Sequence, residues 1–324
     1  MSIIESINIT SVAPDWWDEK LLKFSSSHIY LTKEYSLVME KTFGFKPIFF
    51  FSDNVMLLGF EQPLKGIASN LGKGFIAFAP PVFLDESALD GLFKAVEDEC
   101  KKRKIISITL WGSTLWDKPE LFLASEFESV KMENVVAKLG KSETELFETL
   151  DHAARKNLSK VGEYFSKVVD GSAIDLDDYY LHYKLHHESI GLEVYPKVFF
   201  ESLFYEIIQN KVGKFFILRD ADGVFAAGLM VGTFGKSVYE LSISSNWEKR
   251  NIFPNDILKW YTIKWANSNG FSQFDLSNIA VGAEEGSKEF NVNRFKKKFG
   301  SVVEYHAFKK KLGIAKLLTK LKRA

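Results

Sequence analysis

The sequence predicts an α/β protein made of two similar halves. Segments with the composition of strands alternate with segments of helical period, which is the pattern of α/β folds. The same order of elements occurs twice, and this indicates a duplication even though no residue-level repeat is obvious. With 324 residues, 46% of them hydrophobic, the chain can form two domains of ordinary size, each with its own core.

The first half is predicted to alternate helices with strands around one hairpin. Two β-rich runs flank Asp53 and Asn54, and these residue types are typical of a hairpin turn. Leu89, Leu92 and Val96 recur at helical spacing and indicate a helix before the last strand. The predicted elements are a helix over residues 32–42, strands over 49–51, 55–60 and 75–78, a helix over 87–102 and a strand over 105–111.

The second half repeats this order after a long connecting helix. Ser142 and Glu145 form a capping-box pattern, which predicts a single helix that begins there and runs through Leu158. Asp222 and Gly223 supply a turn between two strands. The later predicted elements are helices over residues 176–189 and 197–209, strands over 214–218, 224–231 and 236–244, a helix over 255–267 and a strand over 271–276.

Composition excludes several classes of protein. Lys plus Arg and Asp plus Glu number 42 each, so no global positive field is available to hold nucleic acid non-specifically. The single cysteine, Cys100, excludes an internal disulfide and a Cys-based zinc cluster and fits a reducing compartment. The first residues lack the features of a signal peptide, and no apolar run approaches membrane-spanning length. A cytoplasmic protein is therefore expected.

The stretch from residue 270 to 308 is the part of the sequence that most resembles a functional site. Phe274 and Leu276 are apolar and alternate with Asp275 and Asn278, so a buried strand delivers an acid and an amide to its end. Open α/β sheets keep their sites at the ends of such strands. This stretch is expected to continue through an irregular acidic loop and a short basic helix to a closing strand.

The short basic helix of this stretch allows two interpretations. Arg294, Lys296, Lys297 and Lys298 place four cations within five residues, and Phe295 begins an apolar pair with Phe299, one turn later. One interpretation is a solvated basic face that the phenylalanines anchor. The other is an anion site, because fixed Lys and Arg side chains beside a strand end suit a phosphate or a developing oxyanion.

The residues of this stretch resemble the FemAB-like transferases. Phe274-Asp275, followed by Arg294-Phe295-Lys296 and Phe299-Gly300, is similar to the C-terminal signature of that family. The piece Ala154-Arg155-Lys156-Asn157-Leu158 resembles the basic helix before the second domain. The resemblance implies two tandem GNAT-like domains with mixed twisted sheets flanked by helices. The expected boundaries are residues 1–150 and 151–308, with 309–324 as a C-terminal helix.

The same resemblance implies the activity and the site. Members of the family add amino acids to the stem peptide of a peptidoglycan precursor, with aminoacyl-tRNA as donor. Lys296, with Phe295, matches the catalytic position, and Tyr195 lies in a loop that resembles the acceptor cleft. The candidate site residues are Lys296, Phe295 and Asp275 as catalytic residues, and Arg155, Lys156, Tyr195, Tyr239, Glu240, Arg250, Asn278 and Arg294 as substrate-binding residues.

Two details of the second half leave alternatives open. Ordinary strand alternation would place Glu240 and Ser242 on one face, whereas a functional Glu240 would face an acyl donor. Residues 245–254 contain no glycine, which departs from the Gly-rich loop of CoA-binding GNAT proteins. The donor can therefore be aminoacyl-tRNA or acyl-CoA, and no tightly bound cofactor is expected.

Other functions and partners are kept as alternatives. They are acyl-CoA-dependent N-acylation of an amino sugar or amino acid, and a non-catalytic module that binds a glycan or a nucleotide-linked sugar. His182 and His186 lie one helical turn apart, but Tyr183 stands where an HExxH motif has its glutamate, so no metal site is expected.

The last residues of the sequence, 309–324, are predicted to form a basic amphipathic helix. Ile314, Leu317, Leu318 and Leu321 fall on one helical face, and the segment holds seven lysines and arginines without one acid. Such a helix can pack on the first domain or lie on an anionic membrane surface. The second possibility would bring the enzyme to a lipid-linked precursor.

Overall fold

The structure, a computed structural model, describes residues 6–64, 72–116, 120–123, 126–313 and 315–316. Contacts divide the chain into two compact units. Unit 1 comprises Met1–Met132 and Glu304–Ala324, and unit 2 comprises Glu133–Val303. The division therefore falls before residue 150, where the sequence analysis places it, and the C-terminal strand returns to unit 1. Each unit is described by itself.

Unit 1 contains a mixed sheet with the order β1-β2-β3-β4-β6-β13. Its neighbouring strands are antiparallel, except that β4 and β6 are parallel. Its elements are β1 (Asn8–Thr10), α1 (Trp17–Leu21), η1 (Ile29–Leu31), α2 (Lys33–Phe43), β2 (Lys46–Phe51), β3 (Val55–Pro63), β4 (Lys73–Ala77), β5 (Val82–Phe83), α3 (Ala88–Lys102), β6 (Ile105–Trp111), α4 (Glu120–Leu123), and parts of β7 (Glu128–Lys138) and β13 (Ser301–Lys311).

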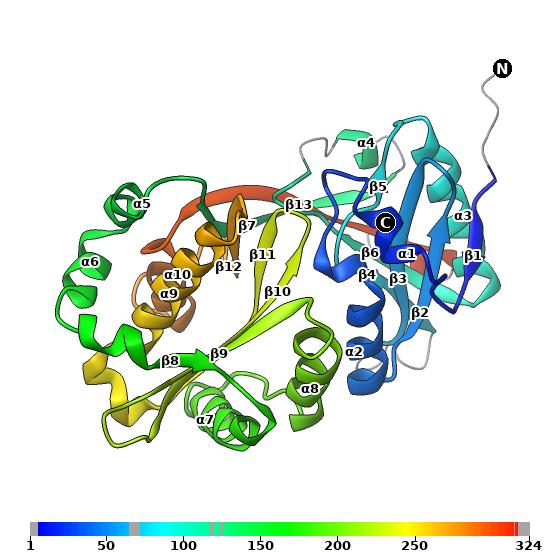
Figure 1. The fold of residues 1–324 in the computed structure, drawn as a ribbon. Coiled ribbons are helices and arrows are strands. Elements are labelled where there is room, and N and C mark those ends of the chain that lie inside the picture. The colour runs from blue at the N-terminus through cyan, green and yellow to red at the C-terminus, as the bar shows by residue number, and fades with distance from the viewer. Residues whose placement is uncertain (1–5, 65–71, 117–119, 124–125, 314, 317–324) are drawn as a thin grey trace. The chain divides into compact units, whose positions relative to one another are not determined.

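The strands of unit 2 pair in the order β7-β12-β11-β10-β9-β8. Here β11 and β12 are the parallel pair. Its further elements are α5 (Glu143–Thr149), α6 (His152–Leu158), η3 (Gly162–Lys167), β8 (Val168–Asp170), η4 (Ala173–Asp175), α7 (Leu176–Ser189), α8 (Lys197–Ser202), the π-helix η5 (Leu203–Ile208), β9 (Gly213–Arg219), β10 (Phe225–Phe234), β11 (Ser237–Ser245), η6 (Trp247–Ile252), α9 (Pro254–Ser268), β12 (Gln273–Ile279) and α10 (Lys288–Lys297) (Figure 1).

The two units repeat one topology, which confirms the predicted α/β class and tandem architecture. In unit 1, β2, β3 and β4 are followed by α3 and then by β6, which pairs parallel to β4. In unit 2, β9, β10 and β11 are followed by α9 and then by β12, which pairs parallel to β11. A helix that connects two parallel neighbours in each unit is the βαβ arrangement that places sites at strand ends.

The core of unit 2 lies between its sheet and α9. Leu229 and Val231 of β10, Val238 of β11 and Phe274 of β12 point to the side on which α9 packs with Ile257 and its neighbours. On the other face, the Tyr179 hydroxyl of α7 donates to Ser242 of β11 at 2.8 Å. Helices therefore cover both faces of this sheet, as Figure 1 shows.

Several predicted elements need correction. The single helix expected from Ser142 to Leu158 is two helices, because Leu150 and Asp151 have extended backbones and the Asp151 carboxylate accepts from the Ala153 amide at 2.8 Å to cap α6. The capping box at Ser142 is confirmed. Strand β7 was not predicted, and its buried residues are Val135, Val136 and Ala137.

The tail also begins differently from the expectation. Lys309 to Lys311 belong to strand β13 and pair with β6, so the predicted helix does not start at residue 309. Lys310 points to the α3 side of the sheet, where its Nζ lies 2.5 Å from a Glu97 oxygen. Leu312 is buried and donates its amide to the Ile106 carbonyl. Residues 314 and 317–324, which hold the predicted apolar face, lie outside the described residues.

Candidate active site

Strands β11 and β12 separate in the middle of the unit 2 sheet, and we call this point the fork. Their parallel register has three pairs, the last of which places Tyr239 opposite Asp275. Beyond it β11 continues to Ser245 and β12 to Ile279, and no further pair joins them. Strands that separate expose backbone polar groups at their carboxyl ends, which is where open α/β sheets bind ligands.

Each strand of the fork carries a β-bulge beside it. On β11, Met230 is opposite Ser242 while Val231 is opposite Glu240, so Leu241 is an extra residue. On β12, Asp275 is opposite Val136 of β7 and Asn278 is opposite Asn134, so β12 has one extra residue in this interval. Ser277, within the second bulge, has a φ of +70°, a conformation that residues other than glycine rarely adopt. Bulges and such backbone strain gather at functional sites, where they re-aim side chains.

The bulge on β11 rules out one of the two alternatives for this strand, ordinary side-chain alternation. That alternative would place Glu240 and Ser242 on the same face. Instead, Ser242 accepts from Tyr179 of α7, whereas Glu240 contacts Lys259 of α9 on the opposite face. The extra residue Leu241 is the cause, because it shifts the alternation by one position.

Lys259 and Glu240 form a buried charged pair at the fork. Their side chains are 1% and 7% exposed. The Lys259 amine also lies 5.8 Å from the centre of the Phe274 ring, on β12. Burial lowers the pKa of Lys259 well below its ordinary value, and the charge of Lys296 lowers it further. Sequence reasoning missed Lys259, although it precedes the apolar Ile263 and Ala266 at spacings of four and seven on the buried side of α9.

Asp275 is held by an amide that the sequence analysis also missed. The carboxylate is 3% exposed, and both of its oxygens accept from Nδ2 of Asn134 at 2.9 Å. The amide of Ser277 donates to it as well, at 2.8 Å. Asn134 belongs to the unpredicted strand β7, so no sequence signal placed it beside Asp275. These donors fix the carboxylate in one orientation.

Lys296 reaches the fork from α10. Its Nζ donates to the carbonyl of Asn278 at 3.0 Å, directly after the β12 bulge. Burial lowers the pKa of Lys296 from 10.5 to about 8, and the Asp275 carboxylate raises it in part. The structure therefore brings together five of the predicted site residues at the fork: Tyr239, Glu240, Asp275, Asn278 and Lys296.

Other residues of α10 have different surroundings. The Phe295 ring packs against the core and lies 5.5 Å from the Phe299 ring, so it anchors the helix. Arg294 and Lys297 are exposed and line a cavity of about 570 Å³. Neither side chain has a hydrogen bond or an ion pair among the residues that the structure describes. The same cavity is lined by the acids Glu133 and Asp151.

The first turn of α9 already holds an anion of its own. Asp256 is buried, and its carboxylate accepts from Lys298, which directly follows α10, at 3.0 Å and from Asn157 of α6 at 3.2 Å. This carboxylate occupies the end of α9 where backbone amides attract negative charge. The N-terminus of α9 is therefore less suited to bind a phosphate than the exposed side chains of Arg294 and Lys297 on α10.

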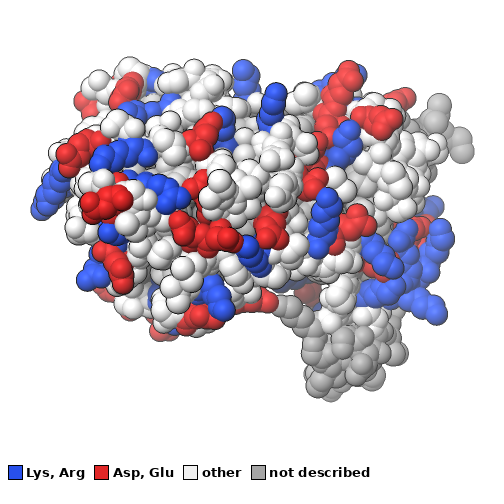
Figure 2. All heavy atoms as spheres, turned by 60° about the horizontal axis from the view of Figure 1, so that its bottom comes forward, with Lys and Arg blue, Asp and Glu red and all other residues white. Residues whose placement is uncertain are grey.

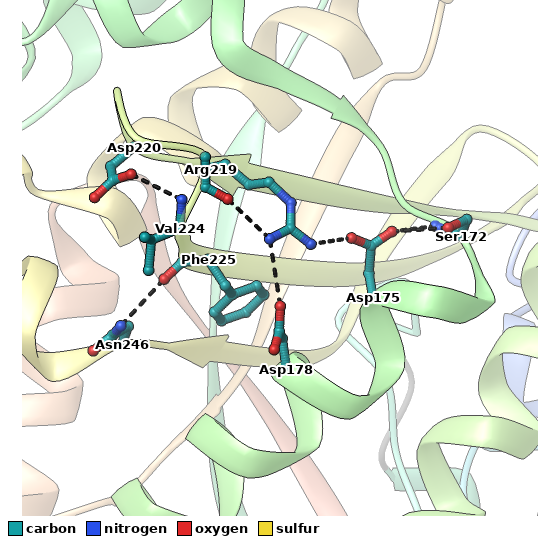
Figure 3. A network of polar contacts seen from close by, with 9 residues as sticks. Ser172, Asp175, Asp178, Arg219, Asp220, Val224, Phe225 and Asn246 are labelled. Carbon is teal, nitrogen blue, oxygen red and sulfur yellow. Dashed lines mark hydrogen bonds and ion pairs between the residues drawn. The ribbon is translucent and has the colours of Figure 1, made fainter.

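The segment between β11 and α9 is a structured 3₁₀ helix instead of a glycine-rich loop. Asn246 donates through Nδ2 to the Phe225 carbonyl at 3.2 Å, and Lys249 lies 2.5 Å from an Asp220 oxygen. Figure 3 shows Asn246 and Asp220 on either side of Val224 and Phe225. In the same network, Arg219 bridges two acids of the α7 region, Asp175 at 2.6 Å and Asp178 at 3.4 Å.

The remaining predicted residues lie on other elements. Arg155 and Lys156 are on α6, where Arg155 donates to the Glu148 carbonyl at 3.1 Å. Arg250 is in η6, with its guanidinium 5.0 Å from the centre of the Trp247 ring. Tyr195 precedes α8 and packs edge-on against Phe199.

Two further observations concern metals and membranes. Among the described residues, no three His, Cys, Asp or Glu side chains are grouped as metal ligands. His182 instead stacks on Phe225, with 5.3 Å between ring centres. Within the same part of the chain, no helix combines the length and the apolar character needed to cross a bilayer.

Comparison with known proteins supports the fold. Residues 151–296 match the family model of the acetyltransferase (GNAT) domain. This match covers the fork and ends at Lys296. No curated protein matches the sequence.

Solved structures match nearly the whole chain at low identity. FemX superposes with a TM-score of 0.76 at 12% identity, over 97% of this chain and 99% of that one. The C-terminal domain of a proposed lysylphosphatidylglycerol synthetase from Agrobacterium fabrum has a TM-score of 0.58 at 14% identity, over 94% and 96%. A tandem GNAT protein from the clavulanic acid biosynthesis pathway has a TM-score of 0.53 at 9% identity, over 95% and 99%. The chain therefore has the FemAB-like tandem GNAT fold that its sequence predicts.

Proposed function

From a tandem GNAT fold with a lysine held at its fork, we propose that the protein transfers an acyl or aminoacyl group to an amine of a cell-envelope precursor. The observation that carries the proposal is Lys296, whose amine donates to the Asn278 carbonyl at 3.0 Å at the fork and has its pKa lowered by burial to about 8. The match to the GNAT domain and the likeness to FemX support acyl transfer as the reaction. The protein is then an acyltransferase or aminoacyltransferase.

The transfer needs charge stabilisation at one place. The acceptor amine attacks the acyl carbonyl, and the oxygen of that carbonyl becomes negative as the new C–N bond forms. The bond to the leaving oxygen or sulfur then breaks, and the leaving atom gains the proton that the amine loses. The ammonium form of Lys296 is suited to stabilise the oxyanion. The fixed carboxylate of Asp275 is suited to orient the amine.

For the donor, we favour aminoacyl-tRNA. The segment that would bind a CoA pyrophosphate is a 3₁₀ helix held by contacts of Asn246 and Lys249. In addition, the Asp256 carboxylate occupies the first turn of α9. Phosphates of an RNA end are better matched to Arg294 and Lys297, which line the 570 Å³ cavity. Acyl-CoA is the second candidate, and the description of the matching family model as an acetyltransferase favours it.

For the acceptor, we favour a lipid-linked or nucleotide-linked precursor of the cell envelope. The name of one similar structure describes synthesis of lysylphosphatidylglycerol, an aminoacylated lipid. The FemAB-like signature around Lys296 points to a peptidoglycan precursor. A lipid-linked acceptor suits a cytoplasmic protein that contacts the membrane peripherally through residues 309–324.

The decisive experiment offers the purified protein both kinds of donor. Charged tRNAs and acyl-CoAs are each combined with nucleotide-linked and lipid-linked acceptors that carry a free amine, and amide formation is followed by mass spectrometry. We expect turnover with charged tRNA and none with the Lys296→Ala variant. Turnover with acyl-CoA and none with charged tRNA would show that the donor is acyl-CoA. No turnover with any pair, together with saturable binding of a glycan or nucleotide sugar, would establish a binding module instead.

A further inference from the structure

An exposed tryptophan lies beyond the open end of the fork. Trp247 is 68% exposed, more than any other of the seven tryptophans of the chain. It begins η6, just after β11 ends at Ser245. From Tyr239 at the fork to Ser245, β11 spans roughly 20 Å of extended strand. Trp247 therefore follows the carboxyl end of a strand that borders the fork, where open α/β sheets bind ligands.

Contacts on both sides of Trp247 hold its backbone in place. Before it, the Asn246 amide donates to the Ala226 carbonyl at 2.9 Å, and Nδ2 of Asn246 donates to the Phe225 carbonyl at 3.2 Å. After it, the Glu248 amide donates to Oδ1 of Asn246 at 3.0 Å. Single exposed aromatic residues are common on protein surfaces. An aromatic residue on a segment fixed in this way, however, loses little conformational freedom when a ligand stacks on it.

A cation with no acidic partner accompanies this tryptophan. The Arg250 guanidinium lies 5.0 Å from the centre of the Trp247 ring, and within the described parts of the chain it pairs with no carboxylate. The neighbouring Lys249 is instead paired with Asp220, at 2.5 Å. A guanidinium beside a ring keeps N–H groups that can donate to a phosphate. An aromatic face next to such a cation matches a nucleotide, which offers a base and a phosphate together.

We infer that Trp247 and Arg250 bind the nucleotide part of the acyl donor, with a base stacked on the indole ring and a phosphate at the guanidinium. The inference rests on the proposed function for the role of that nucleotide as donor, but its binding can be measured without any transfer. In acyl-CoA, the pantetheine arm separates the acyl sulfur from the adenine, whereas aminoacyl-tRNA carries its acyl group on the terminal adenosine. A base that stacks roughly 20 Å along β11 from the fork is then the adenine of CoA or a base that precedes the terminal adenosine of the RNA.

The test measures the binding of two ligands to the full-length protein by calorimetry, CoA and the single-stranded RNA trinucleotide CCA. Trp247→Ala should weaken binding by about fivefold or more, because base stacking is lost, and Trp247→Phe should retain most of the affinity. Trp247→Leu, which is apolar but has no ring, should bind as weakly as the alanine variant. Arg250→Gln should weaken binding and reduce its dependence on salt, because a phosphate contact is lost.

The matched control is Trp16→Ala, in unit 1. Trp16 is 40% exposed and also has a cation beside its ring, the Lys20 amine at 5.2 Å from the ring centre. Its loss should leave the binding of both ligands unchanged.

The ligand whose affinity depends on Trp247 identifies the donor, tRNA for the trinucleotide and acyl-CoA for CoA. The inference is overturned if neither ligand binds, or if Trp247→Ala or Trp247→Leu, with the melting temperature of the parent protein, binds as tightly as the parent. Binding that depends on Trp247, without turnover for any pair of donor and acceptor, would leave the nucleotide site standing while the proposed function fails.

Discussion

Lys296 holds its proton less tightly than an exposed lysine, because burial removes its amine from water and Asp275 offsets only part of that loss. If the ammonium form stabilises the oxyanion, turnover should fall as the pH rises above about 8, where the proton is lost. Lys296→Ala should lower the rate by about two orders of magnitude or more. Lys296→Arg should retain part of the rate and move the alkaline limb upward, since a guanidinium keeps its charge.

The same shift has a consequence for stability that needs no substrate. The pKa of Lys296 is lower in the folded chain, about 8, than its ordinary 10.5, so the unfolded chain binds more protons between these values. The contribution of Lys296 to the free energy of unfolding should therefore rise with pH across this window. This rise should be missing from Lys296→Ala and present in Lys236→Ala, a control in the exposed turn before β11. Parallel curves for all three proteins would contradict the assignment.

The sequence predicted the site residues whose role is indicated by the residues next to them in the chain. Asp275 and Lys296 stand at a strand end and in a basic helix, and both lie at the fork. Asn134 and Lys259 were not predicted as site residues, because the residues they contact are distant in the chain. Asn134 is 141 positions from Asp275, and no pattern around it indicates that pairing. A buried polar residue is defined by its partner, and the partner is a product of the fold.

Among the elements, β12 shows how a bulge builds the site. Ser277 has a φ of +70°. Its amide donates to the Asp275 carboxylate, and the carbonyl of the next residue, Asn278, accepts from Lys296. Ser277→Gly removes the side chain that disfavours this conformation and should keep or raise the free energy of unfolding, by up to about 1 kcal/mol. Ser277→Val should lower it by about 1–2 kcal/mol, because a β-branched residue tolerates positive φ poorly.

Urea unfolding of the two variants checks this prediction, with transfer activity as a second measurement. A bulge that aims Asn278 at Lys296 should survive in Ser277→Gly, so this variant should also retain turnover. A loss of stability in Ser277→Gly, or full stability in Ser277→Val, would show that the backbone at residue 277 does not need the left-handed conformation.

Helices with a clear spacing of apolar residues were predicted correctly, but the break in the connecting helix and the bulge in β11 were not predicted. The helices α3, α7 and α9 follow long runs of helical spacing and appear within one or two residues of their predicted bounds. The connecting helix instead breaks at Leu150, where Asp151 caps a second helix. The alternation along β11 fails at Leu241, because pairing with β10 sets the bulge there.

For the whole chain, the duplication was predictable and the boundaries of the units were not. Unit 1 is completed by β13, which returns from the far end of the chain to pair with β6. No change of composition marks such a return. The charge balance is equally even, with 42 basic and 42 acidic residues. Figure 2 shows both signs interspersed over much of the face in view, with Lys and Arg gathered near one edge.

A balanced chain that binds an anionic membrane must do so through a local segment, and residues 309–324 are the candidate. Beyond β13 they carry four cations, Lys316, Lys320, Lys322 and Arg323, and no acid, and each cation near an anionic surface contributes about 1 kcal/mol of attraction. The full-length protein should therefore co-sediment with vesicles rich in anionic lipid, and added salt should release it. A variant that ends at Gly313 keeps β13 and the buried Leu312 intact and should stay in solution. Neutral vesicles are the control for apolar binding alone. If both proteins stay in solution and truncation instead lowers the melting temperature, the segment stabilises unit 1, and the acceptor need not be linked to a lipid.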